Sequence, residues 1–323
     1  MSLPPAALPA VHLSAPRYVL GEQVADHTSI DNLLERARRF KMAPRAELWG
    51  WGAIRRTAKS LEALAVESAR ATVAAAGADP AGIDCLILCS TRFPGGPRTH
   101  GGFVEKVMSG IGLVDAAVTG LTLNRCTNLL TGIRTAHALV AAGTHRRVLV
   151  VTTDRVTDES VRMENFALFS DGSASCLISA DADPLGADTY EILAGAAAQD
   201  PTSLDWSHEI SSELARTVNR RILDAVGMKL DEIDGLLHPN LFKPLIALKE
   251  RQAGFTRQQL HLDNITRFGH CFAADPLINL VDRQDAGELR PGGHYLLASS
   301  VPGSRVGVLL RASSPVTPDR GEN

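Results

Sequence analysis

The 323-residue sequence carries no large excess of charge and no long apolar run. Its formal net charge of −3 gives no electrostatic reason to expect a nucleic acid or an anionic membrane as a partner. No apolar stretch approaches the ~18 residues that a membrane-spanning helix needs. The opening segment, MSLPPAALPAVHLSAP, lacks a basic region and is interrupted by prolines, so we expect no secretory signal peptide.

The sequence contains few cysteines, and their number is odd. Five cysteines in a chain of this length do not suggest a disulfide framework, and they favour a location in the reducing cytoplasm. Cys85 and Cys89 are four residues apart, but the second ends the apolar run LILC and no further ligand pair is near. We therefore expect both to be buried core residues, and we expect no metal site.

The chain instead repeats a unit of helix, glycine and strand. Residues 74–88 (AAAGADPAGIDCLIL) align with residues 224–238 (DAVGMKLDEIDGLLH) at an offset of 150. Residues 124–143 (NRCTNLLTGIRTAHALVAAG) align with residues 268–287 (FGHCFAADPLINLVDRQDAG) at an offset of 144. Any α/β protein can show one such match, whereas two in the same order favour an internal duplication.

This duplication predicts an α/β protein with two similar halves, residues 1–183 and residues 184–323. The segment SADADPLGADTY at 179–190 is a plausible join because it contains a proline and a glycine. The runs CLILC, VLVV and YLLA are continuously apolar. That pattern is typical of strands in a sheet that is covered by helices on both faces.

The second repeat places Cys126 at the start of a predicted helix. Apolar residues follow it at helical spacing, and Gly143 would end the helix: these are Leu129, Leu130, Ile133, Ala136 and Val140. The partial positive charge at a helix N-terminus favours a thiolate and can lower the pKa of a thiol from ~8.5 to ~3.5–7.5. Free N–H groups at the same end can donate to an oxyanion.

Two histidines gain a position from the same repeat. At the offset of 144, Cys126 corresponds to His270, which should begin the equivalent helix of the second half. His238 ends the predicted strand DGLLH, and the carboxyl ends of strands are where α/β folds bind ligands. If the halves pack about a pseudo-twofold axis, these three side chains converge. Most of the ten histidines are expected to be exposed or structural, and only these two have a positional argument.

At these residues the sequence resembles the thiolase superfamily, and within it the β-ketoacyl-acyl-carrier-protein synthase III branch. The segments LNRCTNLLTGIRTAHALVAAG, FALFSDGSASCLIS, IDGLLHPN and FGHCFAADP resemble family motifs in the family's order. The resemblance covers nearly the whole chain. It implies a thiolase-like five-layered αβαβα sandwich, normally a homodimer, and an acyltransferase activity.

The resemblance also implies residue roles. Cys126 would accept the acyl group, and His238 would polarise the carbonyl of the second substrate or move a proton. His270 stands where this branch normally has asparagine. Pro302 falls where a backbone N–H usually completes the oxyanion hole, and proline has none. Either the loop shifts so that Gly303 donates instead, or a histidine substitutes for the missing donor.

The resemblance leaves two acceptors open. We expect decarboxylative carbon–carbon condensation with a malonyl thioester, in specialised metabolite (natural product) biosynthesis. The alternative is transfer of the acyl group to a hydroxyl or amine of a small molecule, and a catalytically silent partner subunit is a third interpretation. The donor would be an acyl-CoA or an acyl carrier protein, so CoA or phosphopantetheine would arrive with the substrate and no separate cofactor is expected. Lys243, Lys249 and Arg251 are candidates for docking the donor, although scattered charges on a helix are usually only solvated.

Overall fold

The computed structural model describes residues 9–181, 188–205 and 211–313. Within them, nine strands form one sheet in the order β5-β4-β6-β7-β1-β8-β11-β10-β9, and β2 pairs with β3. The strands are β1 His12–Leu20, β2 Gln23–Asp26, β3 Ala53–Arg56, β4 Cys85–Cys89, β5 Ala117–Leu121, β6 Arg147–Asp154, β7 Gly172–Ser179, β8 Thr189–Gln199, β9 Gly235–Leu237, β10 His294–Val301 and β11 Ser304–Ala312.

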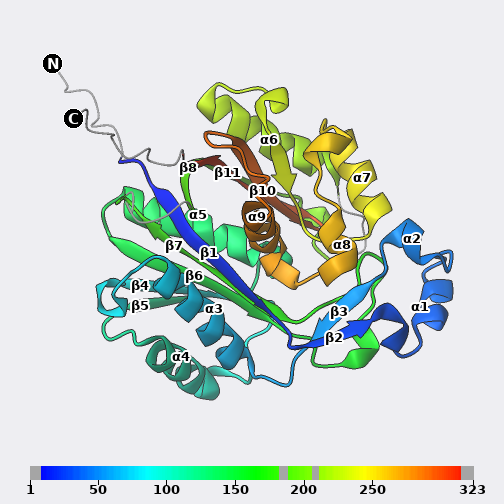
Figure 1. Cartoon of the computed structure of the whole chain (residues 1–323), viewed down its shortest axis with the longest axis horizontal. Coiled ribbons are helices and arrows are strands. Elements are labelled where there is room, and N and C mark those ends of the chain that lie inside the picture. Colours follow the sequence, from blue (N-terminus) through cyan, green and yellow to red (C-terminus); the bar gives the residue numbers. More distant parts are fainter. Residues whose placement is uncertain (1–8, 182–187, 206–210, 314–323) are drawn as a thin grey trace, which may run out of the picture.

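The helices cover the sheet on both sides and also fill its middle (Figure 1). They are α1 Leu33–Arg39, α2 Ala46–Trp49, α3 Leu61–Ala75, α4 Pro97–Ile111, α5 Asn128–Ala141, α6 Ser212–Val226, α7 Lys243–Gln252, α8 Asp263–Phe268 and α9 Asp275–Asp285. Helices α3 and α4 pack together on the strands of the first half, whereas α6 packs on β8 and β11 and also touches α7.

Two helices lie between the two parts of the sheet. Helix α5 contacts β4, β6 and β7 on one side and β8, β10 and β11 on the other. Helix α9 contacts β1 and β7 as well as β9 and β10. The described chain therefore has five layers: outer helices, strands, the inner pair α5 and α9, strands, and outer helices again (Figure 1).

The strands of the two sequence halves occupy opposite ends of the sheet. Strands β1 and β4–β7 stand on one side, and β8–β11 stand on the other. The two parts join where β1 pairs antiparallel with β8, from His12 opposite Glu191 to Ser14 opposite Thr189. The expected boundary between residues 183 and 184 lies outside the described residues, so the division into domains stays a prediction.

The local elements follow from the residue patterns. The runs CLILC, VLVV and YLLA form the buried cores of β4, β6 and β10, as predicted. Helix α5 buries the predicted apolar face, and Gly143 follows its end with φ of +69°. Positive φ suits glycine because it has no Cβ to clash with the backbone. Among the described residues, no helix is long and apolar enough to cross a membrane.

One expectation about helix starts is wrong. His270 does not begin the helix that corresponds to α5; it lies five residues before α9. A short 3₁₀ turn, Phe272–Ala274, separates the two, and Phe272 has φ of +52°. Irregular backbone and a 3₁₀ turn therefore stand between His270 and the helix, and a sequence alignment on the terminal glycines cannot reveal them.

Candidate active site

Cys126 lies directly before the central helix α5. It sits in a 3₁₀ turn, Arg125–Thr127, that leads into the helix, and its side chain is buried. The Oγ of Ser299, on β10, donates a hydrogen bond of 2.9 Å to the carbonyl oxygen of Cys126. A strand of the second half therefore holds the turn that carries the cysteine of the first half.

His270 contacts Cys126, so the structure brings together two of the three predicted side chains. The imidazole interacts with Cys126, and its Nδ1 lies 2.5 Å from Oδ2 of Asp275. Burial by itself would lower the pKa of His270, but the charge and hydrogen bond of Asp275 and the interaction with Cys126 raise that pKa to about 10. The ring is therefore protonated at neutral pH.

Asp275 is a residue that the sequence patterns do not single out. It is the first residue of α9 and is fully buried. Besides His270, its carboxylate accepts hydrogen bonds from the backbone N–H of Cys271 at 2.7 Å and of Asn240 at 2.5 Å. An aspartate followed by proline is typical of any helix start, so the sequence offers no distinctive signal for it.

His238 follows β9 directly, as predicted, and is fully buried. Its carbonyl oxygen accepts a 2.8 Å hydrogen bond from Nδ2 of Asn279, one turn after Asp275 on α9. Asn240, two residues after His238, bonds to Asp275. The first turns of α9 therefore hold both histidine-bearing loops, and this common support is the link between His238 and the Cys126–His270 pair.

The protonation of His238 differs from that of His270. Burial lowers the pKa of His238, so the ring is neutral at neutral pH. Its Nδ1 lies 2.9 Å from the carbonyl oxygen of Pro239, which can only accept a hydrogen bond, so Nδ1 carries the proton. The lone pair is then on Nε2, for which the described residues provide no partner. Of these two histidines, His270 is therefore positively charged and His238 is neutral at neutral pH.

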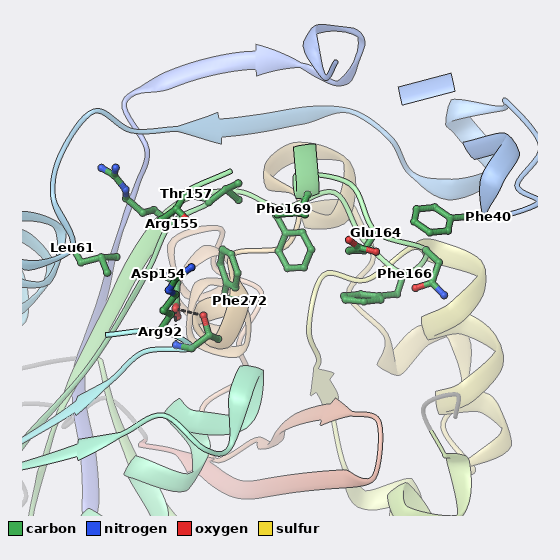
Figure 2. A pocket seen from close by; sticks show the side chains of 14 residues that line it. Phe40, Leu61, Arg92, Asp154, Arg155, Thr157, Glu164, Phe166, Phe169 and Phe272 are labelled. Atoms are coloured by element: carbon green, nitrogen blue, oxygen red, sulfur yellow. Dashed lines mark hydrogen bonds between the residues drawn. The ribbon is translucent and has the colours of Figure 1, made fainter. Parts of the chain in front are cut away.

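A cavity of about 600 Å³ lies beside His270. The rings of Phe169 and Phe272 line it, with their centroids 5.2 and 6.0 Å from the imidazole centroid. Figure 2 shows these two rings side by side, with Phe166 and Phe40 further along the cavity. Its walls are therefore largely aromatic close to the histidine, which suits an apolar group.

Asp154, at the end of β6, also lines this cavity. Its Oδ1 accepts hydrogen bonds from the backbone N–H and the hydroxyl of Thr91 and from the hydroxyl of Ser90. Burial raises the pKa of Asp154 to about 6 against the lowering effect of these hydrogen bonds. The apolar run before it predicted a strand, but nothing in the sequence marked its last residue as a functional candidate.

Pro302 and Gly303 form the two-residue turn between β10 and β11. Gly303 has φ of +70°, and a Cβ there would lie 2.8 Å from the carbonyl oxygen of Asp200. The guanidinium of Arg125 donates a 2.7 Å hydrogen bond to the carbonyl oxygen of Pro302. The turn is thus tied to the residue before Cys126, and donation from Gly303 to an oxyanion stays a prediction.

The three basic residues predicted to dock the donor all lie on α7. Lys243 begins the helix, and its alkyl chain packs close to Gly50. Lys249 and Arg251 belong to the last turn. The residues that line the cavity come from other segments, so the structure places these side chains apart from its walls. Within the described residues, no cluster of three histidine, cysteine or acidic side chains could hold a metal ion.

A protein-family model matches part of the sequence. The model of 3-oxoacyl-[acyl-carrier-protein] synthase III matches residues 122–197. The β-ketoacyl-[acyl-carrier-protein] synthase III of Solibacter usitatus is 25% identical over 283 residues, which cover 76% of this chain and 82% of that protein. The protein of the same name from Gloeobacter violaceus is 34% identical over 125 residues, 38% of this chain and 36% of that one.

Solved structures show the same fold at low identity. The acyltransferase ChlB3 superposes with a TM-score of 0.79 at 16% identity, covering 95% of this chain and 99% of that one. The 3-oxoacyl-(acyl carrier protein) synthase III of Pseudomonas aeruginosa gives a TM-score of 0.76 at 20% identity, covering 96% and 100%. The five-layered, thiolase-like α/β architecture predicted from the sequence is therefore confirmed.

The fold is thiolase-like, and the sequence similarity makes the chain an acyltransferase that resembles synthase III. Within that class, the chain is similar to β-ketoacyl-acyl-carrier-protein synthase III over about three quarters of its length. The predicted resemblance is confirmed, and so is the assignment as a synthase III-like acyltransferase.

Proposed function

We propose that this chain takes an acyl group from a thioester onto Cys126 and passes it to a second substrate. The observation that carries the proposal is the interaction of Cys126, in the turn before α5, with a protonated His270 that is paired with Asp275. An imidazolium beside a thiol favours the thiolate, which is the nucleophile in acyl transfer. The synthase III relatives support an acyl-CoA or an acyl carrier protein as the donor.

Decarboxylative condensation with a malonyl thioester is the reaction that the relatives' names favour. The protonated His270 can stabilise the enolate that forms when carbon dioxide leaves, because it places a positive charge in a buried site. The enolate carbon then attacks the acyl group on Cys126. CoA or phosphopantetheine enters as part of each substrate, so this chemistry requires no separate cofactor. We place the reaction in specialised metabolite assembly, since histidine replaces the usual asparagine.

One observation supports the alternative acceptor. With its proton on Nδ1, neutral His238 presents a lone pair at Nε2 and can accept a proton from an incoming hydroxyl or amine. Polarising a thioester carbonyl would instead need a proton on Nε2. His238 therefore suits a general base, and transfer to oxygen or nitrogen is the second candidate function.

Basic residues beside the cavity could receive the donor. Phe40 lines the cavity and directly follows α1, on which Arg38 and Arg39 are exposed; Lys41 is exposed as well. Phosphate groups of CoA or of a carrier protein would be attracted to this cluster. The α7 residues Lys243, Lys249 and Arg251 remain candidates for a second contact with a carrier protein. Helix α7 contacts α2, the helix that follows this cluster in the chain.

We also propose that the chain forms a homodimer through β5. This strand is at the end of the sheet, and its residues Ala117–Gly120 are exposed. Val118 within the strand is 37% exposed, and Val114 and Leu123 on either side of it are 80% and 92% exposed. An apolar edge strand is a site of pairing with another chain. A second copy of the same strand would cover the edge symmetrically.

Intact-protein mass spectrometry tests the acyl-enzyme. The wild-type chain, Cys126→Ala and the control Cys176→Ala, a buried cysteine of β7, are incubated with acyl-CoAs and acylated carrier proteins. We expect a mass gain in the wild type and in the control, and none in Cys126→Ala. Loading of Cys126→Ala contradicts the proposal. No loading of any variant supports instead a silent partner subunit.

Product analysis then separates the two acceptors. The loaded enzyme is given a malonyl thioester labelled with ¹³C at the free carboxyl, or a set of small alcohols and amines. Release of labelled carbon dioxide together with a β-ketoacyl product assigns condensation. An ester or amide product with no carbon dioxide release assigns transfer to oxygen or nitrogen.

A further inference from the structure

We propose that Asp275 is a positioning residue that fixes the His270 ring toward Cys126 and keeps it protonated, so that the thiol is held as a thiolate. The inference deepens the proposed function, because it concerns the same nucleophile. It rests on the contacts of a fully buried carboxylate with three groups that belong to the two histidine-bearing loops.

The carboxylate fixes the orientation of the ring. Oδ2 of Asp275 lies 2.5 Å from Nδ1 of His270 and also accepts from the N–H of Asn240, while Oδ1 accepts from the N–H of Cys271. A carboxylate with these partners can only accept, so Nδ1 of His270 carries a proton. That leaves Nε2 for the interaction with Cys126. The arrangement is a cysteine, histidine and aspartate in series.

The position of the carboxylate suits this role. Asp275 is the first residue of α9, where the positive end of the helix dipole lies. Two backbone N–H donors and Nδ1 of His270 hold both of its oxygens in place. The carboxylate is therefore a fixed hydrogen-bond acceptor for the His270 ring.

The titratable groups that face His270 all favour the protonated form of the ring. Asp275 from α9, Cys126 from the turn before α5 and Asp154 from the end of β6 all interact with the ring through their negative forms. The other neighbours of the ring are the aromatic side chains of Phe166, Phe169 and Phe272. Among these groups only Asp275 contacts Nδ1, so it alone fixes which way the ring points.

The proton can be followed through the first half of the reaction. In the resting pair the proton of the Cys126 thiol resides on Nε2 of His270. The thiolate forms a bond to the thioester carbonyl carbon, the carbon–sulfur bond to the carrier breaks, and the carrier sulfur takes the proton from Nε2. The carrier leaves as a thiol, and the acyl-enzyme is left with a neutral His270 that is still hydrogen-bonded to Asp275. A proton taken up from solvent then restores the imidazolium before the second substrate reacts.

The test is the pH dependence of Cys126 alkylation by iodoacetamide, followed by peptide mass spectrometry. The wild type is compared with Asp275→Asn, with His270→Asn, with the double variant, and with Asp285→Asn as a control at an exposed position of the same helix. Asp275→Asn should move the alkylation midpoint toward ~8.5, the value of an ordinary thiol, and slow the reaction at pH 6 by at least about tenfold. Asp285→Asn should match the wild type.

The double variant shows whether Asp275 acts through His270 or only stabilises the fold. If Asp275 acts through His270, Asp275→Asn should change the alkylation rate less than about twofold in the His270→Asn background. An equal loss in both backgrounds overturns the proposal, as does an unchanged midpoint in Asp275→Asn. Thermal unfolding of each variant identifies any that fail to fold; for those, Asp275→Glu keeps the charge and should retain the wild-type midpoint. Alkylation needs no acyl donor. If the alkylation of Cys126 shows the expected pH dependence but no acyl donor loads the enzyme, only the proposed function is refuted.

Discussion

Arg125 donates a hydrogen bond from its guanidinium to the carbonyl oxygen of Pro302, at 2.7 Å. The bond links the turn that carries Cys126 to the turn between β10 and β11, 177 residues later in the chain. Arg125 itself has φ of +54°, a conformation that an arginine adopts only where its surroundings hold it. The pair therefore fixes the distance between the nucleophile and Gly303.

Replacing Arg125 by methionine should loosen this link. We expect the rate of acyl loading to fall by about tenfold or more, because Gly303 would no longer be held at a fixed place for donation to an oxyanion. Single-turnover loading followed by mass spectrometry measures the effect. Arg216→Met, which removes an exposed arginine paired with Glu213, is the control and should load at the wild-type rate. Equal rates for Arg125→Met and the wild type would show that the link is unimportant for loading.

The fold was predictable because its signals are local and repeated. Apolar runs, glycine stops and two ordered matches are enough to place β4, β6, β10 and α5. Cys126 and His238 could be placed for the same reason, since each lies at the end of a regular element. The backbone before α9 was not predictable. Positive φ at Phe272 and the extra 3₁₀ turn depend on tertiary contacts, and they decide where His270 lies.

The supporting residues of the site were also missed, for a different physical reason. Asn279 and Asp154 act through contacts with residues far away in sequence, His238 and Thr91. Asp275 bonds to His270, which is near in sequence, but it also holds Asn240, 35 residues away. A hydrogen-bonded carboxylate at a helix start has the same local pattern as any helix cap. Only the three-dimensional arrangement distinguishes a carboxylate that supports the site from an ordinary helix cap.

His238→Gln should separate the two halves of the reaction. Because the described contacts of Cys126 involve His270 rather than His238, acyl loading should stay within a few-fold of the wild type. Product formation should fall by 10²–10⁴, the usual contribution of a positioned acid or base. Loading is measured by intact mass and product by liquid chromatography with mass spectrometry. Loss of loading in His238→Gln, with a normal melting temperature, would contradict this division of roles.

Asp154 should make the folded chain less stable as the pH rises. Its folded-state pKa of about 6 lies above the ordinary value of 3.8, so the folded state holds the proton more tightly. Stability is therefore greatest at low pH with respect to this group and is lost as the pH rises from about 4 through about 6. Asp154→Asn removes that loss, and its stability relative to the wild type should increase over this range by on the order of 3 kcal/mol at most.

Urea unfolding at pH 4.5 and pH 7.5 measures this difference. Asp158→Asn is the control with the opposite sign, because hydrogen bonds from the Ser160 side chain and N–H lower the pKa of the exposed Asp158. That variant should lose stability relative to the wild type at the higher pH. Parallel pH curves for the wild type and Asp154→Asn would show that the carboxyl titrates normally.

Glu250→Gln should destabilise the chain strongly. Glu250 and Arg305 form an ion pair in which both side chains are buried, with Nη1 and Oε1 2.5 Å apart. Removing one charge leaves the other buried without a counter-charge, which typically costs about 3–5 kcal/mol. Glu213→Gln breaks the exposed pair with Arg216 and should cost less than about 1 kcal/mol. Urea unfolding compares the two, and equal losses would mean that Arg305 finds another partner.

Val118→Arg should prevent association through β5. The substitution puts a charge on the apolar edge of the sheet, where a second copy would have to bury it. Light scattering should give twice 34.5 kDa for the wild type and 34.5 kDa for the variant. Val24→Arg is the control, because Val24 is equally apolar and 62% exposed but belongs to the separate pair of β2 and β3. A wild type that is already monomeric, or a dimer that Val24→Arg disrupts equally, would contradict β5 as the interface.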